Sequence, residues 1–483
     1  SGKGFFTLPL KVSINNIYER IHTKTIRYSP SVLLHSDALS VYAQQSDVQT
    51  YAVAKQFSAP LTVCTIDQLL KFAYKYNGGE LQLATLSYSK LVIDEIQSYS
   101  PKLLGTIVYA LMQIHRLGGK FAITTATFPK IILPFLEDAG VDFIRSPVFY
   151  GDVKHRHCVT LMERNEFDYD FIAEQGKHKK VLIIVNKVDR AKTVYNQLRG
   201  KDADVRLLHS RFLRKDRMIL EEEIVRFGKS NECGIWVSTQ IVEASLDIDF
   251  DMLFTEMCSM DSLLQRMGRV FRSREYDDIG TPNVYILPNE SGVGVKETAI
   301  IHREIYDASM KALQSVMGTK SCVLLQEHAD CDSKQQMVDA MYDGLSKNGE
   351  YYSTLKNQIK GLEQLHWYDV NKQNVDRLFR DISSVTVIPR NVYEDNQSKL
   401  ELLSKQIAEA KSIKASIDAR TELYGYTVDV SDNPNLDKAP CGYFTGHDVY
   451  ICNGTYDFNE QNMQGEGFSP KYKDRKNPSV NIL

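Results

Sequence analysis

Short apolar runs alternate with segments of helical periodicity over the first 290 residues, and this alternation constrains the fold most. In the first half of that region we expect strands at 5–8, 31–34, 61–64, 91–93 and 121–124. Helices are expected between them; for example, Ile14, Ile17, Tyr18 and Ile21 fall on one helical face. Val-, Ile- and Leu-rich strands separated by helices are typical of a parallel sheet covered by helices.

The same pattern restarts after residue 151. Strands are expected at 181–185, 205–208, 234–237 and 252–254, with helices at 189–198 and 216–227. We therefore predict an α/β fold with two tandem parallel-sheet domains, at 1–150 and 151–290. A helical linker (291–375) and a small C-terminal accessory domain (376–483) are expected to follow. The absence of a fixed short repeat excludes a solenoid.

Charge and cysteine content exclude several classes of protein. The 58 Lys and Arg residues against 61 Asp and Glu residues give a net charge of −3, so a polyanion must be bound by a local basic lining. No apolar run reaches the roughly 18 residues of a membrane span, and no membrane partner is expected. Eight cysteines without a C-x-x-C pair indicate reduced thiols in a cytoplasmic protein. Six cysteines and histidines with no common zinc spacing are expected to be ordinary thiols and imidazoles: Cys322, His328, Cys331, Cys441, His447 and Cys452.

The run Leu-Val-Ile-Asp-Glu-Ile-Gln (91–97) is the strongest local signal. Its two carboxylates, Asp94 and Glu95, follow a buried strand, at the sheet edge where ligands bind in open parallel sheets. Asp94 is predicted to hold Mg²⁺ on a nucleotide, and Glu95 to orient the water that attacks the γ-phosphate. The alternative is a strand end capped by two solvated acids.

A second signal is the run Asp-Ser-Leu-Leu-Gln-Arg-Met-Gly-Arg-Val-Phe-Arg (261–272). It predicts one helix with Asp261 as its N-cap. Gln265, Arg269 and Arg272 then share one stripe and form a catalytic set, whose two guanidinium groups suit a clamp on phosphate charge. Gly268 in the middle of this helix suggests the close approach of another surface. The alternative is a surface helix with scattered arginines.

Several strand ends are expected to complete the site. Thr125 and Thr127 are predicted to couple hydrolysis to the cleft, and Asp247 to reach a ribose hydroxyl or a clamp arginine. Hydroxyl, amide and basic groups at the same sheet edges are predicted to contact a DNA backbone: Thr7, Pro9, Thr65, Gln68, His209, Ser210, Arg211, Thr239 and Gln240. Each alone is more typical of an ordinary strand-to-helix turn, so only the ordered set carries weight.

These motifs, in this order, resemble superfamily-two helicases. Asp-Glu-Ile-Gln (94–97), His-Ser-Arg-Phe (209–212) and the segment 378–389 resemble, more narrowly, the CRISPR-associated helicase-nuclease family of type I interference. The resemblance covers almost the whole chain. It implies two RecA-like domains, a linker helix and an accessory domain that closes over single-stranded DNA. It also implies ATP and Mg²⁺ as cofactors, and ATP-driven 3′-to-5′ movement in antiviral defence on the strand displaced by a guide-RNA surveillance complex of the Cascade type.

Two departures from the family pattern are clear. Family members carry a metal nuclease domain before the helicase, which we expect here in cis or on a separate chain; His447-Asp448 is interpreted as a turn. A complete G-x-x-x-x-G-K-[ST] phosphate loop is missing from the sequence. Ser1-Gly2-Lys3 is interpreted as the end of such a loop, with Gly2 and Lys3 binding ATP; a remnant of an expression tag is the alternative.

Two other functions remain open. A non-hydrolysing scaffold would bind DNA or a surveillance complex with the same fold. A motor subunit of a restriction or remodelling enzyme would share the helicase motifs. The paired acids and arginines favour hydrolysis over the scaffold.

Overall fold

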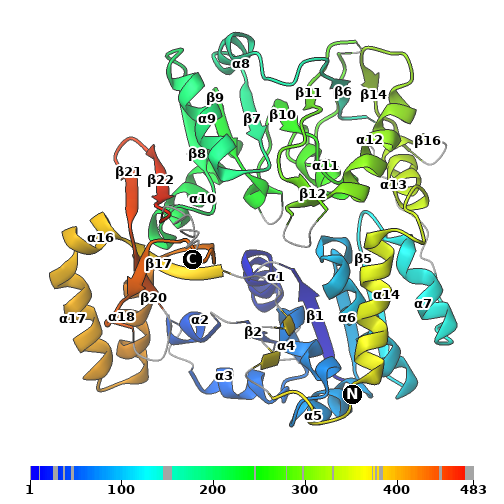
Figure 1. Cartoon of the computed structure of the whole chain (residues 1–483), viewed down its shortest axis with the longest axis vertical. Helices are drawn as coiled ribbons and strands as arrows, with labels where there is room; N and C mark the ends of the chain where they lie inside the picture. Colours follow the sequence, from blue (N-terminus) through cyan, green and yellow to red (C-terminus); the bar gives the residue numbers. More distant parts are fainter. Residues whose placement is uncertain are drawn as a thin grey trace, which may run out of the picture.

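The structure is a computed structural model. It describes residues 2–9, 11–24, 31–35, 38–44, 48–144, 155–243, 246–278, 280–295, 299–328, 331–371, 374–375, 378–379, 384–444 and 449–473. Two α/β regions lie one above the other, and the C-terminal elements lie along one side of both (Figure 1).

The first region is built on a five-stranded, all-parallel sheet of order β2-β3-β1-β4-β5. Its strands are β1 (Gly4–Leu8), β2 (Ser31–Leu34), β3 (Leu61–Thr65), β4 (Lys90–Asp94) and β5 (Lys120–Thr124). Because the strands are parallel, their carboxyl ends meet at one edge. That edge therefore collects Pro9, Thr65, Asp94 and Thr124 from segments far apart in the sequence.

Helices connect these strands, as the sequence pattern predicts. They are α1 (Lys11–Lys24), α2 (Ala38–Gln44), α3 (Val48–Lys55), α4 (Ile66–Leu70), α5 (Gly79–Leu86), α6 (Pro101–Arg116) and α7 (Leu133–Asp138), with short 3₁₀ turns at Lys71–Tyr74, Ile96–Ser98 and Lys130–Ile132. Helix α6 begins at Ser100, whose side chain accepts a hydrogen bond from the Leu103 amide, and Pro101 occupies the first turn. This places the start of α6 directly after the Asp-Glu-Ile-Gln segment.

The second region contains a seven-stranded sheet of order β14-β6-β11-β10-β7-β9-β8. Its strands are β6 (Cys158–Leu161), β7 (Lys180–Ile184), β8 (Val205–Leu208), β9 (Gly234–Ser238), β10 (Met252–Glu256), β11 (Val284–Leu287) and β14 (Val323–Leu324). Only the edge strand β14 is antiparallel to its neighbour. The central strands are buried along their whole length, which agrees with their uninterrupted apolar sequences.

Helices and short strand pairs complete this region. They are α8 (Tyr169–Gly176), α9 (Val188–Arg199), α10 (Arg214–Lys229), a 3₁₀ turn at Gln240–Val242, α11 (Met260–Met267), α12 (Arg303–Met317), α13 (Ser333–Asp343), and the pairs β12 (Val293–Gly294) with β13 (Ile301–His302) and β15 (Glu327–His328) with β16 (Cys331–Asp332). Apolar residues of α12 and α13 belong to the same core as the seven-stranded sheet.

The predicted linker is divided between the two cores. Helix α14 (Glu350–Gln364) begins with Tyr351 in the core of the second region, and Leu355, one turn later, lies in the core of the first. Helix α14 packs along α6, and the pair stands at one side of the molecule in Figure 1. A Cβ atom added at Gly105 of α6 would lie 2.7 Å from the Leu355 carbonyl oxygen, so a glycine is needed where the helices approach.

The C-terminal region forms a third core around a mixed four-stranded sheet of order β18-β17-β20-β19. Its elements are β17 (Ser384–Pro389), α16 (Arg390–Asp395), α17 (Gln397–Ala408), α18 (Ile413–Gly425), β18 (Val428–Ser431), β19 (Lys438–Pro440), β20 (Val449–Cys452) and the hairpin β21 (Gly454–Asn459) with β22 (Gln464–Pro470). Helix α18 contacts α2 of the first region, and β22 contacts β8 of the second.

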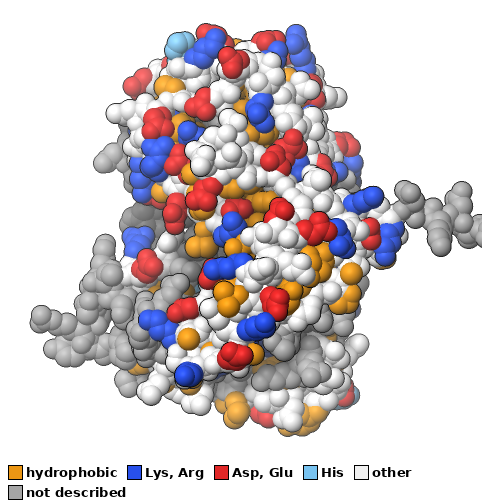
Figure 2. All heavy atoms as spheres, turned by 90° about the vertical axis from the view of Figure 1, so that its left-hand side faces the viewer, with side chains coloured by type: hydrophobic (Ala, Val, Ile, Leu, Met, Phe, Trp, Pro, Cys, Tyr) orange, Lys and Arg blue, Asp and Glu red, His pale blue; other side chains and the backbone are white. Residues whose placement is uncertain are grey.

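The face that carries the C-terminal region shows mixed charge. Lys and Arg side chains are interspersed with Asp and Glu side chains over it (Figure 2). Within the described ranges, no helix has the length and apolar content needed to cross a membrane.

Candidate nucleotide site between the two α/β regions

Asp94 and Glu95 stand at the carboxyl edge of the first sheet, as predicted. Asp94 ends β4, and the Glu95 amide donates to the Thr124 carbonyl oxygen at 3.0 Å. Glu95 adopts a left-handed backbone conformation with φ of +54°, which costs a non-glycine residue free energy. Such strain, held at the end of a buried strand, is typical of functional positions.

The acids are joined to the threonines that follow β5. Thr124 Oγ1 donates to Asp94 Oδ1 at 2.7 Å. Gln97 bridges the two segments, because its amide nitrogen donates to Glu95 and its amide oxygen accepts from Thr125. The Thr127 amide donates in turn to Thr125 Oγ1 at 3.1 Å. This network gives a physical path for the coupling role predicted for Thr125 and Thr127, which stays a prediction.

The arginine segment differs from its predicted form. Helix α11 is capped by Ser259, whose side chain accepts from the Ser262 amide at 3.3 Å, not by Asp261. The helix ends at Met267, so the predicted helix to residue 272 is wrong. Gly268 lies at the C-cap, and a Cβ there would meet only the carbonyl oxygens of the preceding turn, so the predicted approach of another surface is also wrong. Arg269 and Arg272 are therefore presented by an irregular segment.

Gln265 and Arg269 nevertheless face the acids of the first region. Gln265 Nε2 lies 3.5 Å from Glu95 Oε2, across the boundary between the two regions. Arg269 is close enough to Glu95 for each to shift the pKa of the other. The paired acids and the arginine segment therefore meet at one interlobe site.

Backbone carbonyl groups fix the Arg269 guanidinium. It donates to the Glu243 oxygen at 2.6 Å and to the Leu246 oxygen. Its buried Nε has no hydrogen-bond partner in the part of the chain that the structure describes. Arg272 is exposed, and its Nε lies 3.7 Å from Asp247 Oδ1. Of the two roles predicted for Asp247, this geometry favours contact with a clamp arginine.

Burial shifts the pKa of one group on each side of the site. It raises the pKa of Glu95, and the Asp94 charge adds to this, while hydrogen bonds from Gln97 and Gln265 and the charge of Arg269 oppose it. Burial, together with the charge of Arg272, lowers the pKa of Arg269 to about 10. A partly desolvated carboxylate facing a partly desolvated guanidinium suits proton transfer and stabilisation of phosphate charge.

Sequence reasoning missed the structural role of Arg266. Its side chain is 2% exposed and donates to the Glu243 carboxylate at 2.7 Å and to Thr255 Oγ1 and Asn186 Oδ1, each at 2.9 Å. Arg266 thus ties α11 to the ends of β7 and β10. Its spacing from the other arginines could not reveal this, because its partners lie up to 80 residues away.

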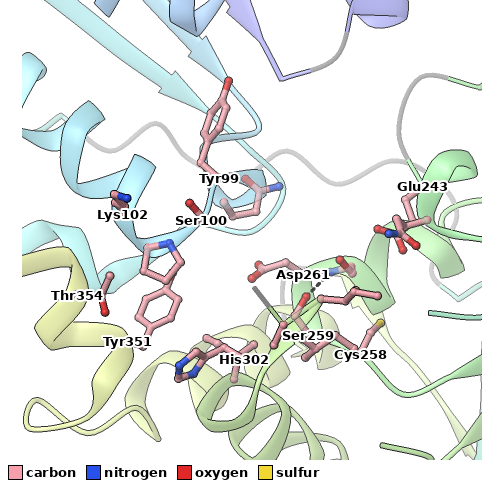
Figure 3. A pocket seen from close by; sticks show the side chains of 18 of the residues that line it. Tyr99, Ser100, Lys102, Glu243, Cys258, Ser259, Asp261, His302, Tyr351 and Thr354 are labelled. Atoms are coloured by element: carbon pink, nitrogen blue, oxygen red, sulfur yellow. Dashed lines mark hydrogen bonds between the residues drawn. The ribbon is translucent and has the colours of Figure 1, made fainter. Parts of the chain in front are cut away.

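A cavity of about 290 Å³ opens beside Gln97, between the two regions. Ser100 and Lys102 of the first region lie across it from Asp261 and Ser259 of the second, and His302 and Tyr351 lie along a third side, while the Tyr99 ring points away from Asp261 (Figure 3). Asp261 is buried; Tyr342 donates to its Oδ2 at 2.9 Å, and burial raises its pKa to about 6. No sequence pattern pointed to this interlobe acid.

The structure contradicts the prediction that Gly2 and Lys3 bind phosphate. Gly4 pairs with Lys90 in the parallel register, so Lys3 lies at the amino-terminal edge of the sheet. Four residues of β4 separate Lys90 from Asp94, a distance of roughly 13 Å at about 3.3 Å per residue. Lys3 Nζ donates instead to the Phe57 carbonyl oxygen. These residues lie on the wrong edge to share a ligand with Asp94.

Four of the predicted DNA-contacting side chains are buried. Thr7 is fully buried, and its Oγ1 donates to the Val92 oxygen at 3.2 Å; Thr65 and Thr239 are also buried. His209 is fully buried and stacks on Phe212, under the β21–β22 hairpin. The structure therefore gives no support to DNA contacts by these side chains, and contacts by the backbone amides at the same strand ends stay predictions.

The remaining predicted DNA contacts are at least partly accessible. Ser210 and Gln240 are exposed, and Pro9, Gln68 and Arg211 are partly exposed. Gln68 donates to Asp67 at 2.8 Å, and Arg211 pairs with Asp189 at 2.5 Å. Their contacts with DNA stay predictions.

The predicted ligand for Mg²⁺ is the Asp94 carboxylate, and its role stays a prediction. Among the described residues, no group of three or more His, Cys, Asp or Glu side chains could hold a metal ion. His447 and Asp448 lie outside the described residues. A lone Asp94 carboxylate at the sheet edge still fits Mg²⁺, because this ion keeps waters and takes most other ligands from nucleotide phosphates.

Comparison with known proteins agrees with this geometry. A family model described as CRISPR-associated nuclease/helicase Cas3, C-terminal, matches residues 177–275. The CRISPR-associated nuclease/helicase Cas3 of Methanothermobacter thermautotrophicus is 28% identical over 427 residues, 83% of this chain and 50% of that protein. The Escherichia coli CRISPR-associated endonuclease/helicase Cas3 is 26% identical over 339 residues, 60% of this chain and 36% of that protein. The chain thus spans between about a third and a half of these relatives.

Solved structures show the same fold. A crystal structure of T. fusca Cas3 with AMPPNP has a TM-score of 0.70 at 18% identity, over 94% of this chain and 62% of that one. This likeness shows that the two α/β regions have the fold of two RecA-like domains, and between them an acid pair faces an arginine segment. These similarities, in sequence and in fold, support a CRISPR Cas3-type helicase, and they cover the helicase and C-terminal part of those proteins.

Proposed function

We propose that this protein is an ATP-driven translocase on single-stranded DNA that acts in type I CRISPR interference. The observation that carries the proposal is the interlobe contact of Gln265 with Glu95, at 3.5 Å, beside the Arg269 guanidinium. A nucleotide bound there contacts both regions. Its hydrolysis therefore removes phosphate contacts that join the two regions and lets them move apart.

Each side chain of the site has a role in this proposal. Glu95 orients the attacking water and accepts its proton, with Gln97 and Gln265 fixing the carboxylate. Arg269 and Arg272 stabilise the charge that develops on the transferred phosphoryl group. Asp94 holds Mg²⁺, which would neutralise phosphate charge when bound with ATP. Gly2 and Lys3 have no part in this mechanism.

Nucleotide binding and recruitment are supported by relatives. T. fusca Cas3 has been crystallised with AMPPNP, ATP and ADP. A CRISPR RNA-guided surveillance complex in a pre-nicking state contains a chain similar to this one, with a TM-score of 0.59 at 16% identity. We extend to this protein ATP as the substrate, a Cascade-type surveillance complex as the partner, and a metal nuclease in cis or on a separate chain.

DNA is proposed to lie along the carboxyl edges of both sheets, under the C-terminal region, and to move in the 3′-to-5′ direction. Accessible polar groups there include Gln68, Ser210 and Gln240. Contacts to a backbone make binding largely independent of sequence and weaker at high salt.

The test is the ATPase rate of the full-length protein with and without single-stranded DNA. We expect DNA to raise kcat, and labelled DNA to bind more weakly as salt rises. An ATPase rate that single-stranded DNA leaves unchanged would exclude a DNA-driven motor. Strong DNA binding without any hydrolysis would establish the scaffold alternative. Turnover that responds only to duplex DNA would favour a restriction or remodelling motor.

A further inference from the structure

The irregular segment after α11 carries the arginines, so its backbone must be held by contacts other than helical hydrogen bonds. On one side it pairs with the segment before β10: the Phe250 amide donates to the Arg269 oxygen at 3.0 Å, and the Phe271 amide donates to the Phe250 oxygen at 3.1 Å. Phe271 has φ of +47°, a strained conformation for a side chain of this size. Such a conformation persists only where the surroundings enforce it.

Two side chains from the start of the second region hold the other side of this segment. Arg156 Nη1 donates to the Arg272 carbonyl oxygen at 2.7 Å. His157, which is fully buried, donates from Nε2 to the Val270 carbonyl oxygen at 2.9 Å. Burial and the nearby charge of Lys334 lower the pKa of His157 to about 4, so it is neutral at physiological pH.

Arg156 is itself oriented by Glu327 of β15. Arg156 Nε donates to Glu327 Oε1 at 3.1 Å, and its Nη2 donates to Oε2, so two nitrogens meet the carboxylate while the third reaches Arg272. Lys334 Nζ also lies 2.8 Å from Glu327 Oε1, and Glu327 Oε1 lies 3.7 Å from His157 Nδ1. The Glu327 side chain is only 13% exposed. Because the Glu327 carboxylate is nearly buried and binds two nitrogens of the Arg156 guanidinium, it holds that guanidinium in one orientation.

We propose that Glu327 is a positioning residue for the arginine segment, acting through Arg156 on the backbone at Arg272, while His157 holds the Val270 carbonyl independently. It touches no nucleotide. It sets the direction in which the Arg269 and Arg272 side chains leave the backbone. That direction decides how well their guanidinium groups contact the phosphoryl group that lies next to Glu95 in the proposed mechanism. The catalytic consequence rests on the proposed function, whereas the positioning of the segment does not.

The first measurement is hydrogen–deuterium exchange over residues 268–274 of the full-length protein. In Glu327→Gln we expect faster exchange there, because the neutral amide no longer holds Arg156. Glu223→Gln is the matched control: Glu223 is 15% exposed and pairs with Arg206 at 3.2 Å and Arg226 at 2.7 Å, away from this segment. Unchanged exchange in Glu327→Gln, or equal changes in both variants, would overturn the inference.

A second variant guards against simple misfolding. Arg156→Lys keeps a cation beside Glu327 but lacks the fork that reaches both the carboxylate and the Arg272 oxygen. We expect it to fold normally and to show faster exchange over 268–274. Normal exchange in a folded Arg156→Lys protein would contradict the assigned path.

ATP turnover provides the catalytic readout. We expect Glu327→Gln to lower kcat roughly 10- to 100-fold with KM for ATP changed less than about threefold, since misplacement by about 1 Å can cost this much. In an Arg272→Ala background the same change should lower kcat by a smaller factor than in the unmodified protein, because only one of the two positioned guanidinium groups is then left. Additive losses would overturn this path. Unchanged turnover in Arg272→Ala alone would refute the proposed function instead, and the exchange result would still stand.

Discussion

The two faces of the proposed site are held in different ways. In the first region, Thr124 donates a side-chain hydrogen bond to Asp94, and Gln97 donates one to Glu95. Glu95 also has a left-handed backbone conformation. On the second region, the Arg269 guanidinium binds backbone carbonyl oxygens, and its segment is held from two sides. The acids can therefore respond to a bound ligand with small side-chain movements, whereas the arginines are preorganised. Preorganised charge is what stabilises a transition state most.

The largest effect is expected from the acid face. Glu95→Gln should lower ATP turnover by roughly 10³-fold, because it removes the general base, and should leave ATP binding intact. In the unmodified protein, turnover should fall as the pH drops through the raised pKa of Glu95, which lies above the ordinary value of 4.5. Steady-state ATPase assays and nucleotide-binding titrations measure both effects. Glu137→Gln, an exposed acid of α7 in the same region, is the control. Equal rates for Glu95→Gln and Glu137→Gln would reject the role of Glu95.

A conservative substitution of Arg269 by lysine should lower ATP turnover, although Arg269 is only partly buried. Arg269→Lys keeps the charge but cannot bind the Glu243 and Leu246 oxygens together, so kcat should fall on the order of 100-fold. Arg274→Lys is the control, since Arg274 pairs with Asp249 and Asp251 in the same stretch. Equal kcat values for Arg269→Lys and Arg274→Lys would show that the fixed orientation of the Arg269 guanidinium does not contribute to ATP turnover.

The contact of α14 with α6 sets how the two faces approach. Gly105→Ala places a Cβ 2.7 Å from the Leu355 oxygen, and overpacking of this kind costs about 1–3 kcal/mol. We expect a lower thermal unfolding midpoint. Gly361→Ala on α14 meets nothing within 4 Å and should be neutral or stabilising by up to about 1 kcal/mol. A Gly105→Ala protein as stable as Gly361→Ala would show that the helices separate freely.

The smallest expected effect concerns Asp261, an acid on the arginine face. Its pKa is raised in the folded protein from 3.8 to about 6, so its contribution to stability is full below pH 3.8 and is lost as the pH rises through 6. The rise from 3.8 to about 6 corresponds to about 3 kcal/mol at about 1.4 kcal/mol per pKa unit. Asp261→Asn should recover about 1–2 kcal/mol of this at pH 8, because its amide hydrogens still need partners in a buried site. Thermal unfolding at pH 8 and pH 4 measures this. The exposed Asp138→Asn is the control, and a pH-independent gain in Asp261→Asn would contradict the raised pKa.

Much of the fold follows from local patterns in the sequence. The five strands of the first sheet and the buried strands β7 to β10 lie where runs of apolar residues predict them, within one or two residues. The acid pair was also placed correctly, because a carboxylate that follows a buried parallel strand can only lie at its carboxyl edge. The order of the motifs was enough to predict two facing regions.

Other features could not be predicted because they depend on partners far away in the chain. The end of α11 at Met267 had no strong sequence signal, since Gly268 is compatible with a helix interior or a cap. His209 is buried by a hairpin some 250 residues later, and the Lys3 side chain is bonded to Phe57. The local pattern of hydrophobic residues predicts neither the burial of His209 nor the hydrogen bond of Lys3.

Strand periodicity and motif order are local properties of the chain, and they were enough to predict the class of fold and the chemical groups at each sheet edge. Which of those groups are accessible, and which of them meet, depends on long-range packing. Register placed Lys3 at the far edge from Asp94, and long-range packing brought Glu327 to Arg156 and Tyr342 to Asp261. Such contacts arise from the free energy of the whole packed molecule, to which residues distant in sequence contribute together.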